Sequence, residues 1–257
     1  MQGIIQDKTI TTNHDLESLY PRPLSGARVT RLPPGRVPAR TTLVGDDVIL
    51  EPQDADKHAA ALFEASHGSE EGLRIWDYLA VGPWADEKSF KAALRDQSSS
   101  LDPIFYTVCD KASGAPCGQI SLMDIHPQNG TIEIGNIWFG PSLQRTRGAT
   151  EALFIALAYA MDDLGYRRMQ WRCNSLNVRS RNAARRLGFR FEGTFHNHLI
   201  FKGMNRDTTW YSILEDEWPE IRGILAKWLA ADNFDNAGRA RGSRAGMMEN
   251  RAPSTRG

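Results

Sequence analysis

The chain has 257 residues, 41% hydrophobic and 24% charged, which is the composition of an ordinary globular protein. Basic and acidic residues are balanced at 31 each, so the overall charge favours neither a nucleic-acid-binding protein nor one that binds a membrane surface. No apolar run reaches the roughly 20 residues that cross a bilayer, and residues 1–20 lack the apolar core of a signal peptide. Three widely spaced cysteines fit neither a zinc pattern nor a disulfide framework, so we expect a protein of the reducing cytoplasm.

The two ends of the chain differ in composition from the middle. Residues 1–40 are rich in proline, arginine, glycine and threonine and show no periodicity, which predicts a mobile leader in which residues 32–35 pack as an extended strap. Residues 233–257 are rich in glycine, alanine and arginine, which predicts a disordered basic tail. A single domain is therefore expected over residues 41–232.

The first half of this domain alternates strands and helices. Val48–Leu50 is a predicted strand, and Asp54 and Asp86 are each placed to cap a helix with a periodic apolar side. The loop between these two helices carries Trp76, Tyr78 and Trp84. Two strands at 105–110 and 116–123 form a predicted hairpin over a Lys-Ala-Ser-Gly turn.

The second half continues the alternation and predicts an α/β fold with a mixed sheet. A helix over 150–164 places Leu153, Leu157, Met161 and Leu164 on one face, and Gly165 follows it as a C-terminal cap. Strand 169–173 turns Met169, Trp171 and Cys173 inward. The remaining predicted elements are the strand 131–139, a short helix over 177–187, short strands near 189–191 and 210–214, and a last helix capped by Asp216.

The segment between the strand 131–139 and the helix 150–164 is the most informative. Its loop, Gln144-Arg145-Thr146-Arg147-Gly148-Ala149, is cationic, rich in small residues, and leads directly into a helix N-terminus. The first amides of a helix have no intrahelical acceptor, and the helix dipole favours negative charge there. The loop therefore predicts a site for a phosphorylated ligand.

The order of these elements, with the motifs Asn177-x-x-Ser180 and Leu187-Gly188-Phe189, resembles the GNAT N-acetyltransferase superfamily. The strings around Ala149-Thr150-Glu151-Ala152 and Asn205-Arg206-Asp207 are similar to its branch of ribosomal-protein alanine acetyltransferases. The resemblance covers about residues 43–220. It implies a GNAT fold, with a mixed central sheet in which the parallel strands 131–139 and 169–173 splay apart, and acetyl-CoA as the acyl donor.

The resemblance also implies how this donor is held. Gln144, Arg147 and Ala149 occupy the three marked positions of the family's pyrophosphate loop, with Arg147 where a glycine is usual. Its side chain either crowds the backbone or reaches outward to the phosphates, and an alternative register uses Arg145 and Gly148. The pantetheine arm would extend the sheet along the edge near Trp138. The implied cofactor-binding residues are Trp138, Gln144, Arg145, Thr146, Arg147, Gly148, Ala149, Thr150 and Asn177.

Acylation of an amine needs a base, a site for the oxyanion and a proton for the leaving thiolate. Glu133 is our candidate base, with a surface carboxylate as the alternative. A backbone N–H near Ile137–Phe139 is the candidate oxyanion donor. Many relatives place a tyrosine as the acid where this chain has Ala184. Ser180 is the remaining candidate, although Asn177 and Ser180 are equally explained as helix caps.

Trp76, Tyr78, Trp84 and His126 are candidates to line the acceptor pocket, and the alternative is that the tryptophans fill the core. We expect no metal site, because His196 and His198 lack a suitably spaced third ligand. The leading hypothesis is an acetyl-CoA-dependent N-acetyltransferase for a small-molecule amine. The alternatives are a protein N-terminal or ribosomal-protein acetyltransferase and a CoA-binding module without turnover; we do not expect a nucleic-acid or membrane partner.

Overall fold

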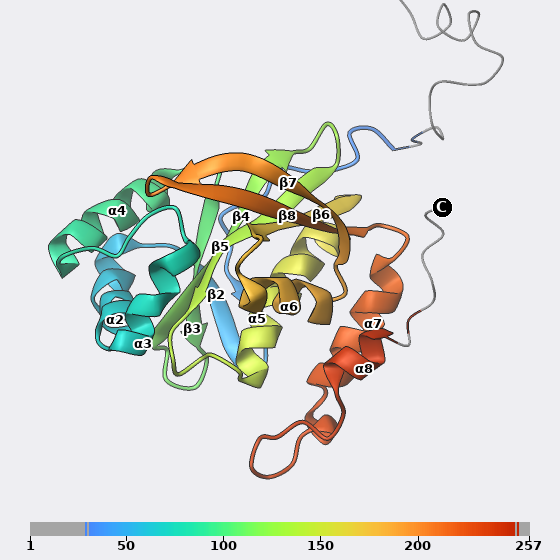
Figure 1. Ribbon diagram of the computed structural model, residues 1–257. Coiled ribbons are helices and arrows are strands. Elements are labelled where there is room, and N and C mark those ends of the chain that lie inside the picture. Colours follow the sequence, from blue (N-terminus) through green and yellow to red (C-terminus); the bar gives the residue numbers. More distant parts are fainter. Residues whose placement is uncertain (1–28, 30, 250, 252–257) are drawn as a thin grey trace, which may run out of the picture. The chain divides into compact units, whose positions relative to one another are not determined.

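The computed structural model describes residues 29, 31–249 and 251, and the elements of the fold belong to the unit that starts at Pro33. Within the described residues the strands form one eight-stranded sheet in the order β1-β2-β3-β4-β5-β6-β8-β7. The prediction of a mixed sheet flanked by helices is confirmed (Figure 1). The strands are β1 (Leu43–Val44), β2 (Val48–Pro52), β3 (Ile104–Asp110), β4 (Pro116–His126), β5 (Thr131–Phe139), β6 (Arg168–Asn174), β7 (Arg190–Phe201) and β8 (Met204–Leu214).

The helices cover the sheet in two groups (Figure 1). None of the described helices combines the length and the apolar character that a membrane span requires. The helices are α2 (Ala55–His67), α3 (Glu70–Leu73), α4 (Glu87–Ser99), α5 (Arg147–Ala158), α6 (Val178–Arg186), α7 (Trp218–Leu229) and α8 (Arg244–Glu249), with a π-helical turn at Tyr159–Asp163 and 3-10 turns at Arg74–Tyr78 and Ala231–Asn233.

Strands β5 and β6 are parallel neighbours that separate along their length. They pair at Thr131 with Arg168, Ile132 with Met169 and Glu133 with Gln170, and the register stops there although both strands continue. The other neighbouring pairs in the sheet are antiparallel. The sheet therefore opens between β5 and β6 just beyond Glu133, as the resemblance implied.

A bulge in β5 changes which face its side chains occupy. Gln119 pairs with Trp138 and Ser121 pairs with Gly135, so between these two pairs β5 contains one residue more than β4. Within this stretch Asn136 adopts a φ of 49°. Ile132 and Ile134 join the large apolar cluster with α5 and α7, whereas Trp138 joins the smaller cluster with α2 and α4. An extra residue inverts the strand alternation, which explains this switch.

Local sequence signals set several helix starts. The Asp54 carboxylate accepts from the amides of Asp56 and Lys57, and Asp86 accepts from Ser89, so both predicted N-caps are confirmed. The predicted cap at Asp216 is wrong. The N-cap of α7 is Glu217, whose carboxylate instead accepts from the Leu214 amide.

The strands β7 and β8 are much longer than the short segments predicted near 189–191 and 210–214. They form one hairpin whose turn residues Lys202 and Gly203 have φ values of 51° and 76°. Two successive residues with positive φ are the requirement of a two-residue type I′ hairpin turn. The lysine at the first turn position conceals this signal, because asparagine or aspartate is the usual residue there.

The strap predicted at residues 32–35 is packed in part, whereas the tail has more structure than its composition predicts. The leader prediction for residues 1–28 and 30 lies outside the described residues, but Pro34 and Gly35 are buried in an extended segment and the Gly35 amide bonds to Pro127 O at 3.1 Å. The tail predicted as disordered contains α8, which packs against α6 and α7. Its last residues, 250 and 252–257, lie outside the described residues.

Candidate active site

Glu133 lies at the point where β5 and β6 part. It belongs to the last registered pair of the two strands, and the residue is almost fully buried at 3% exposure. Its carboxylate pairs with the guanidinium of Arg172 on β6, and the same guanidinium reaches Asp124 at 3.3 Å. Sequence analysis left a surface carboxylate as the alternative for Glu133, and its burial excludes that alternative.

This environment changes the acidity of the Glu133 carboxyl. Burial raises its pKa from 4.5 to about 7, the Arg172 guanidinium opposes the rise, and the charge of Asp124 adds to it. A carboxyl with a pKa near neutrality can both hold and release a proton under ordinary conditions. Glu133 therefore has the acidity that a general base requires.

The residues around Glu133 were not singled out from the sequence. Arg172 also stacks over Trp210, with 4.8 Å from its guanidinium carbon to the ring centroid, and the charge of Glu133 acts on the nearby Arg206. A signal for Arg172 existed. The prediction that Met169, Trp171 and Cys173 face inward implies that Arg172 projects from the opposite face of the same strand.

The loop before α5 is built from successive turns. The amides of Leu143 and Gln144 both bond to Gly140 O, the Gln144 side chain donates to Phe139 O at 2.8 Å, and Arg145 adopts a φ of 63°. Thr146 caps α5 by accepting from the Ala149 amide at 3.1 Å. The remaining amides of the first turn, those of Arg147 and Gly148, have no intrahelical acceptor by helix geometry, so they stay available to an anion.

The side chain of Arg147 neither crowds the loop backbone nor reaches outward to a phosphate site. Its guanidinium bonds to Asp47 at 2.6 Å and to Leu229 O at 2.8 Å, so it turns toward the β1–β2 turn and the end of α7. The side chain therefore leaves the loop uncrowded and is engaged elsewhere. Arg147 contributes its backbone N–H to the first turn of α5, and Arg145 is exposed.

Asn177 caps α6, as expected, whereas the Ser180 hydroxyl bonds elsewhere. Asn177 Oδ1 accepts from the Ser180 amide at 3.0 Å, and Ser180 Oγ accepts from the Trp171 indole at 3.0 Å. A hydroxyl that accepts one bond retains its own proton for donation. Ala184, at the position where the resemblance would place a tyrosine, is fully buried in the core.

The four acceptor candidates are not gathered in one place. Trp76 is 3% exposed and packs against Trp138 and edge-on against Trp84, with 4.9 Å between the indole centroids of Trp76 and Trp84. Trp76 therefore belongs mainly to the core, although it borders a small recess that Trp84 also lines. Tyr78 is 39% exposed, and His126 lies at the end of β4, paired with Asp124 at 3.0 Å.

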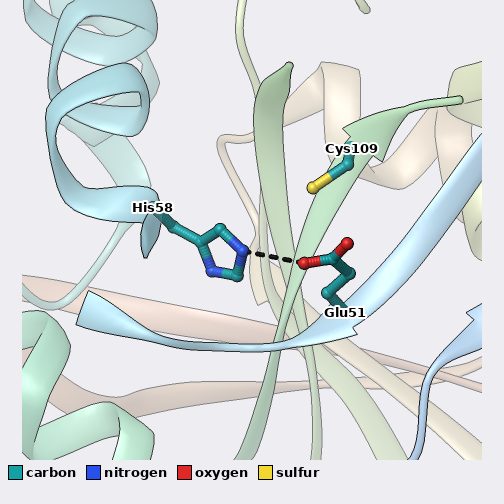
Figure 2. Close-up of side chains that lie close together, drawn as sticks. All are labelled: Glu51, His58 and Cys109. Carbon is teal, nitrogen blue, oxygen red and sulfur yellow. Dashed lines mark hydrogen bonds and ion pairs between the residues drawn. The ribbon is translucent and has the colours of Figure 1, made fainter. Parts of the chain in front are cut away.

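A second cluster, of side chains that could hold a metal ion, lies between α2, β2 and β3. Candidate ligand atoms of Glu51, His58 and Cys109 all lie within 4.8 Å of one another (Figure 2). His58 Nε2 faces Glu51 at 3.0 Å, while Nδ1 accepts from the Asp54 amide at 3.1 Å, so the proton belongs on Nε2. Burial raises the pKa of the Cys109 thiol to about 12, which keeps it protonated. Hydrogen bonding thus accounts for this cluster, with His58 as a neutral structural link.

We expect His58→Ala to destabilise the protein by about 2 kcal/mol, because it removes a fully buried ring and leaves the Asp54 amide without its acceptor. Urea unfolding at constant pH measures the change. Lys57→Ala is the matched control, since its exposed ammonium also contacts Glu51 but contributes little. A rise in the wild-type melting temperature on adding equimolar Zn²⁺ would contradict the structural role.

Comparison with known proteins places this geometry in a family. A family model described as an acetyltransferase (GNAT) domain matches residues 47–190. The crystal structure of a GCN5-related N-acetyltransferase from Brucella melitensis is 43% identical, covers 86% of this chain and 99% of its own, and superposes with a TM-score of 0.83. A GNAT-family protein of Chromobacterium violaceum is 39% identical over 76% of this chain and 96% of its own, with a TM-score of 0.71.

Among curated proteins, YdaF of Bacillus subtilis is 28% identical over 173 residues, which are 66% of this chain and 91% of that protein; its name describes a candidate ribosomal N-acetyltransferase. The family model spans more than half of the chain and includes the opened β5–β6 pair, Glu133 and the loop before α5. The chain therefore belongs to the GNAT family and is an acetyl-CoA-dependent N-acetyltransferase.

Proposed function

We propose that the protein acetylates the primary amine of a small molecule, with Glu133 as the general base. The observation that carries the proposal is the position of Glu133, buried at the point where β5 and β6 part and with a pKa raised to about 7. In its ionised form Glu133 takes a proton from the incoming ammonium or amine, directly or through a water molecule. Arg172 holds the carboxylate in place.

The residues at the start of α5 and along β5 suit the acyl donor, acetyl-CoA. The Arg147 and Gly148 amides at the start of α5 suit a diphosphate, and the unpaired edge of β5 beyond Glu133 suits the pantetheine arm. Acetyl-CoA, when bound, supplies the thioester whose carbonyl the amine attacks. A backbone N–H near Ile137, beside the bulge, is our candidate to bind the oxyanion. Ser180 keeps a proton to donate, either to the neighbouring Cys173 or to the departing thiolate.

Two contacts across the acceptor side support a small acceptor. Tyr78 Oη donates to Leu176 O at 3.4 Å, and Lys202 Nζ from the β7–β8 turn donates to Trp76 O at 2.7 Å. Both join the segment after α3 to elements on the far side of the β5–β6 opening. A protein segment lying across the opening would have to displace them, whereas a small amine would not.

Acetylation of a protein N-terminus is the second candidate, favoured by the similarity to YdaF and by the name of that protein. The two candidates make different demands on the contacts made by Tyr78 and Lys202. A protein acceptor needs these contacts to open, so Lys202→Ala would raise its rate of acetylation. With a small acceptor, the rate of acetylation should stay the same or fall in Lys202→Ala.

The test is a mass-spectrometric screen of the purified full chain with acetyl-CoA against a panel of small primary amines and a panel of peptides. Product from small amines, with none from peptides, supports the proposal. Product from peptides alone would select the second candidate. Tight CoA binding without product in either panel would leave a CoA-binding module. No binding of acetyl-CoA by titration calorimetry would reject all three.

A further inference from the structure

The segment that follows α7 brings one arginine to the start of α5. Arg244 is the first residue of α8, and α8 packs against α6 and α7 (Figure 1). Its Nη1 donates to Oγ1 of Thr150, which lies in the first turn after the loop, and its guanidinium carbon lies 4.8 Å from the centroid of the Trp228 ring. Arg244 lies well beyond residues 47–190, which match the family model.

The charge of Arg244 has no balancing carboxylate among the described residues. Its described contacts are with a hydroxyl and an indole, and its buried Nε has no hydrogen-bond acceptor in the described part of the chain. Burial, and to a smaller extent the neighbouring positive charge of Arg186, lower the pKa of Arg244 to about 10. Arginines are rarely buried without an anion, because desolvation of the charge then goes uncompensated.

A structural role alone leaves this arrangement poorly explained. A clamp that only joined α8 to α5 would work equally well with a neutral side chain, and it would avoid placing two cations together. A phosphate bound beside Thr150 would pair with both arginines and supply the missing acceptor. The free amides of Arg147 and Gly148 belong to the same helix end, so the same ligand can reach both sets of groups.

We propose that Arg244, assisted by Arg186, binds a phosphate of the nucleotide end of CoA, so that the segment after α7 completes the donor site. This inference rests on the proposed function, since it concerns the same donor. The phosphate is either the diphosphate or the 3′-phosphate, which offer the same oxygen chemistry to a guanidinium. In both cases Arg244 is a binding residue for the donor and takes no part in proton transfer.

The test is titration calorimetry of the full chain with CoA and with 3′-dephospho-CoA. We expect Arg244→Gln, which keeps a polar side chain near Thr150 but removes the charge, to weaken CoA binding about tenfold. Arg241→Ala is the matched control, because it removes one positive charge from an exposed position in the same segment and should leave affinity within about twofold. Arg244→Lys should recover part of the loss.

The two ligands distinguish the phosphates. If Arg244→Gln binds 3′-dephospho-CoA as tightly as the wild type does, Arg244 binds the 3′-phosphate. If the substitution weakens binding of 3′-dephospho-CoA as much as it weakens binding of CoA, Arg244 binds the diphosphate. Wild-type affinity in Arg244→Gln would overturn the inference and leave the proposed function intact. A loss of thermal stability in Arg244→Gln without loss of CoA affinity would assign Arg244 to the clamp role. Failure of the wild-type chain to bind CoA would reject the proposed function and this inference with it.

Discussion

We expect Glu133→Gln to lower kcat about 100- to 1,000-fold, with little change in the affinity for acetyl-CoA. Glutamine has nearly the same shape and can still accept from Arg172, but it cannot take a proton from the amine. The substitution should therefore lower kcat, while titration calorimetry should give the same dissociation constant for acetyl-CoA as in the wild type. Steady-state kinetics with an amine acceptor identified in the screen measures the effect.

The pH dependence gives this prediction a second readout. The Glu133 carboxyl must be ionised to act as a base, and its pKa is raised to about 7, so wild-type kcat/KM should rise through about pH 7 and level off above it. Glu133→Gln should lack this rise. Asp124→Asn removes a negative charge that raises the pKa of Glu133, so it should move the rise to lower pH while retaining the plateau. The same rise in Glu133→Gln as in the wild type would assign it to another group.

The features that the sequence predicted correctly depend on neighbours along the chain. The Asp54 and Asp86 caps, the apolar face of α5 and the inward side chains of β6 each follow from a few consecutive residues. The position of Glu133 beside the splayed strands followed instead from the family resemblance, because β5 and β6 are distant in the sequence. The ion pair of Glu133 with Arg172 was not predicted.

The features that the sequence did not predict depend on partners distant along the chain. Arg147 turns away from the loop because Asp47 and Leu229 O, which belong to distant segments, accept its hydrogen bonds. The core position of Trp76, packed against Trp138 and Phe90, was left open as the alternative to an acceptor pocket. The tail is ordered through α8, whose Arg244 reaches Thr150. Composition and periodicity carry no information about such pairings, so the tail resembled a solvated segment.

The second prediction concerns the start of α5. We expect Thr146→Asp to weaken acetyl-CoA binding about 100-fold while the protein keeps its fold. Aspartate is as good an N-cap as threonine and suits the positive end of the helix dipole, so α5 should be retained or strengthened. A carboxylate about 6 Å from a bound phosphate, at an effective dielectric constant of about 20, costs about 2.8 kcal/mol, which corresponds to about 100-fold in affinity. Titration calorimetry measures the affinity, and thermal unfolding checks the fold.

Thr146→Ser is the matched control, because it keeps the hydroxyl that accepts from Ala149 and adds no charge; its affinity should equal that of the wild type. The side chain of Thr146 is exposed, so neither substitution disturbs the core. Loss of binding with an unchanged or raised melting temperature would separate repulsion of the ligand from damage to the helix. Wild-type affinity for acetyl-CoA in Thr146→Asp would mean that the diphosphate lies away from this helix end. The donor would then have to be held by other groups, and the proposed roles of the Arg147 and Gly148 amides would fail.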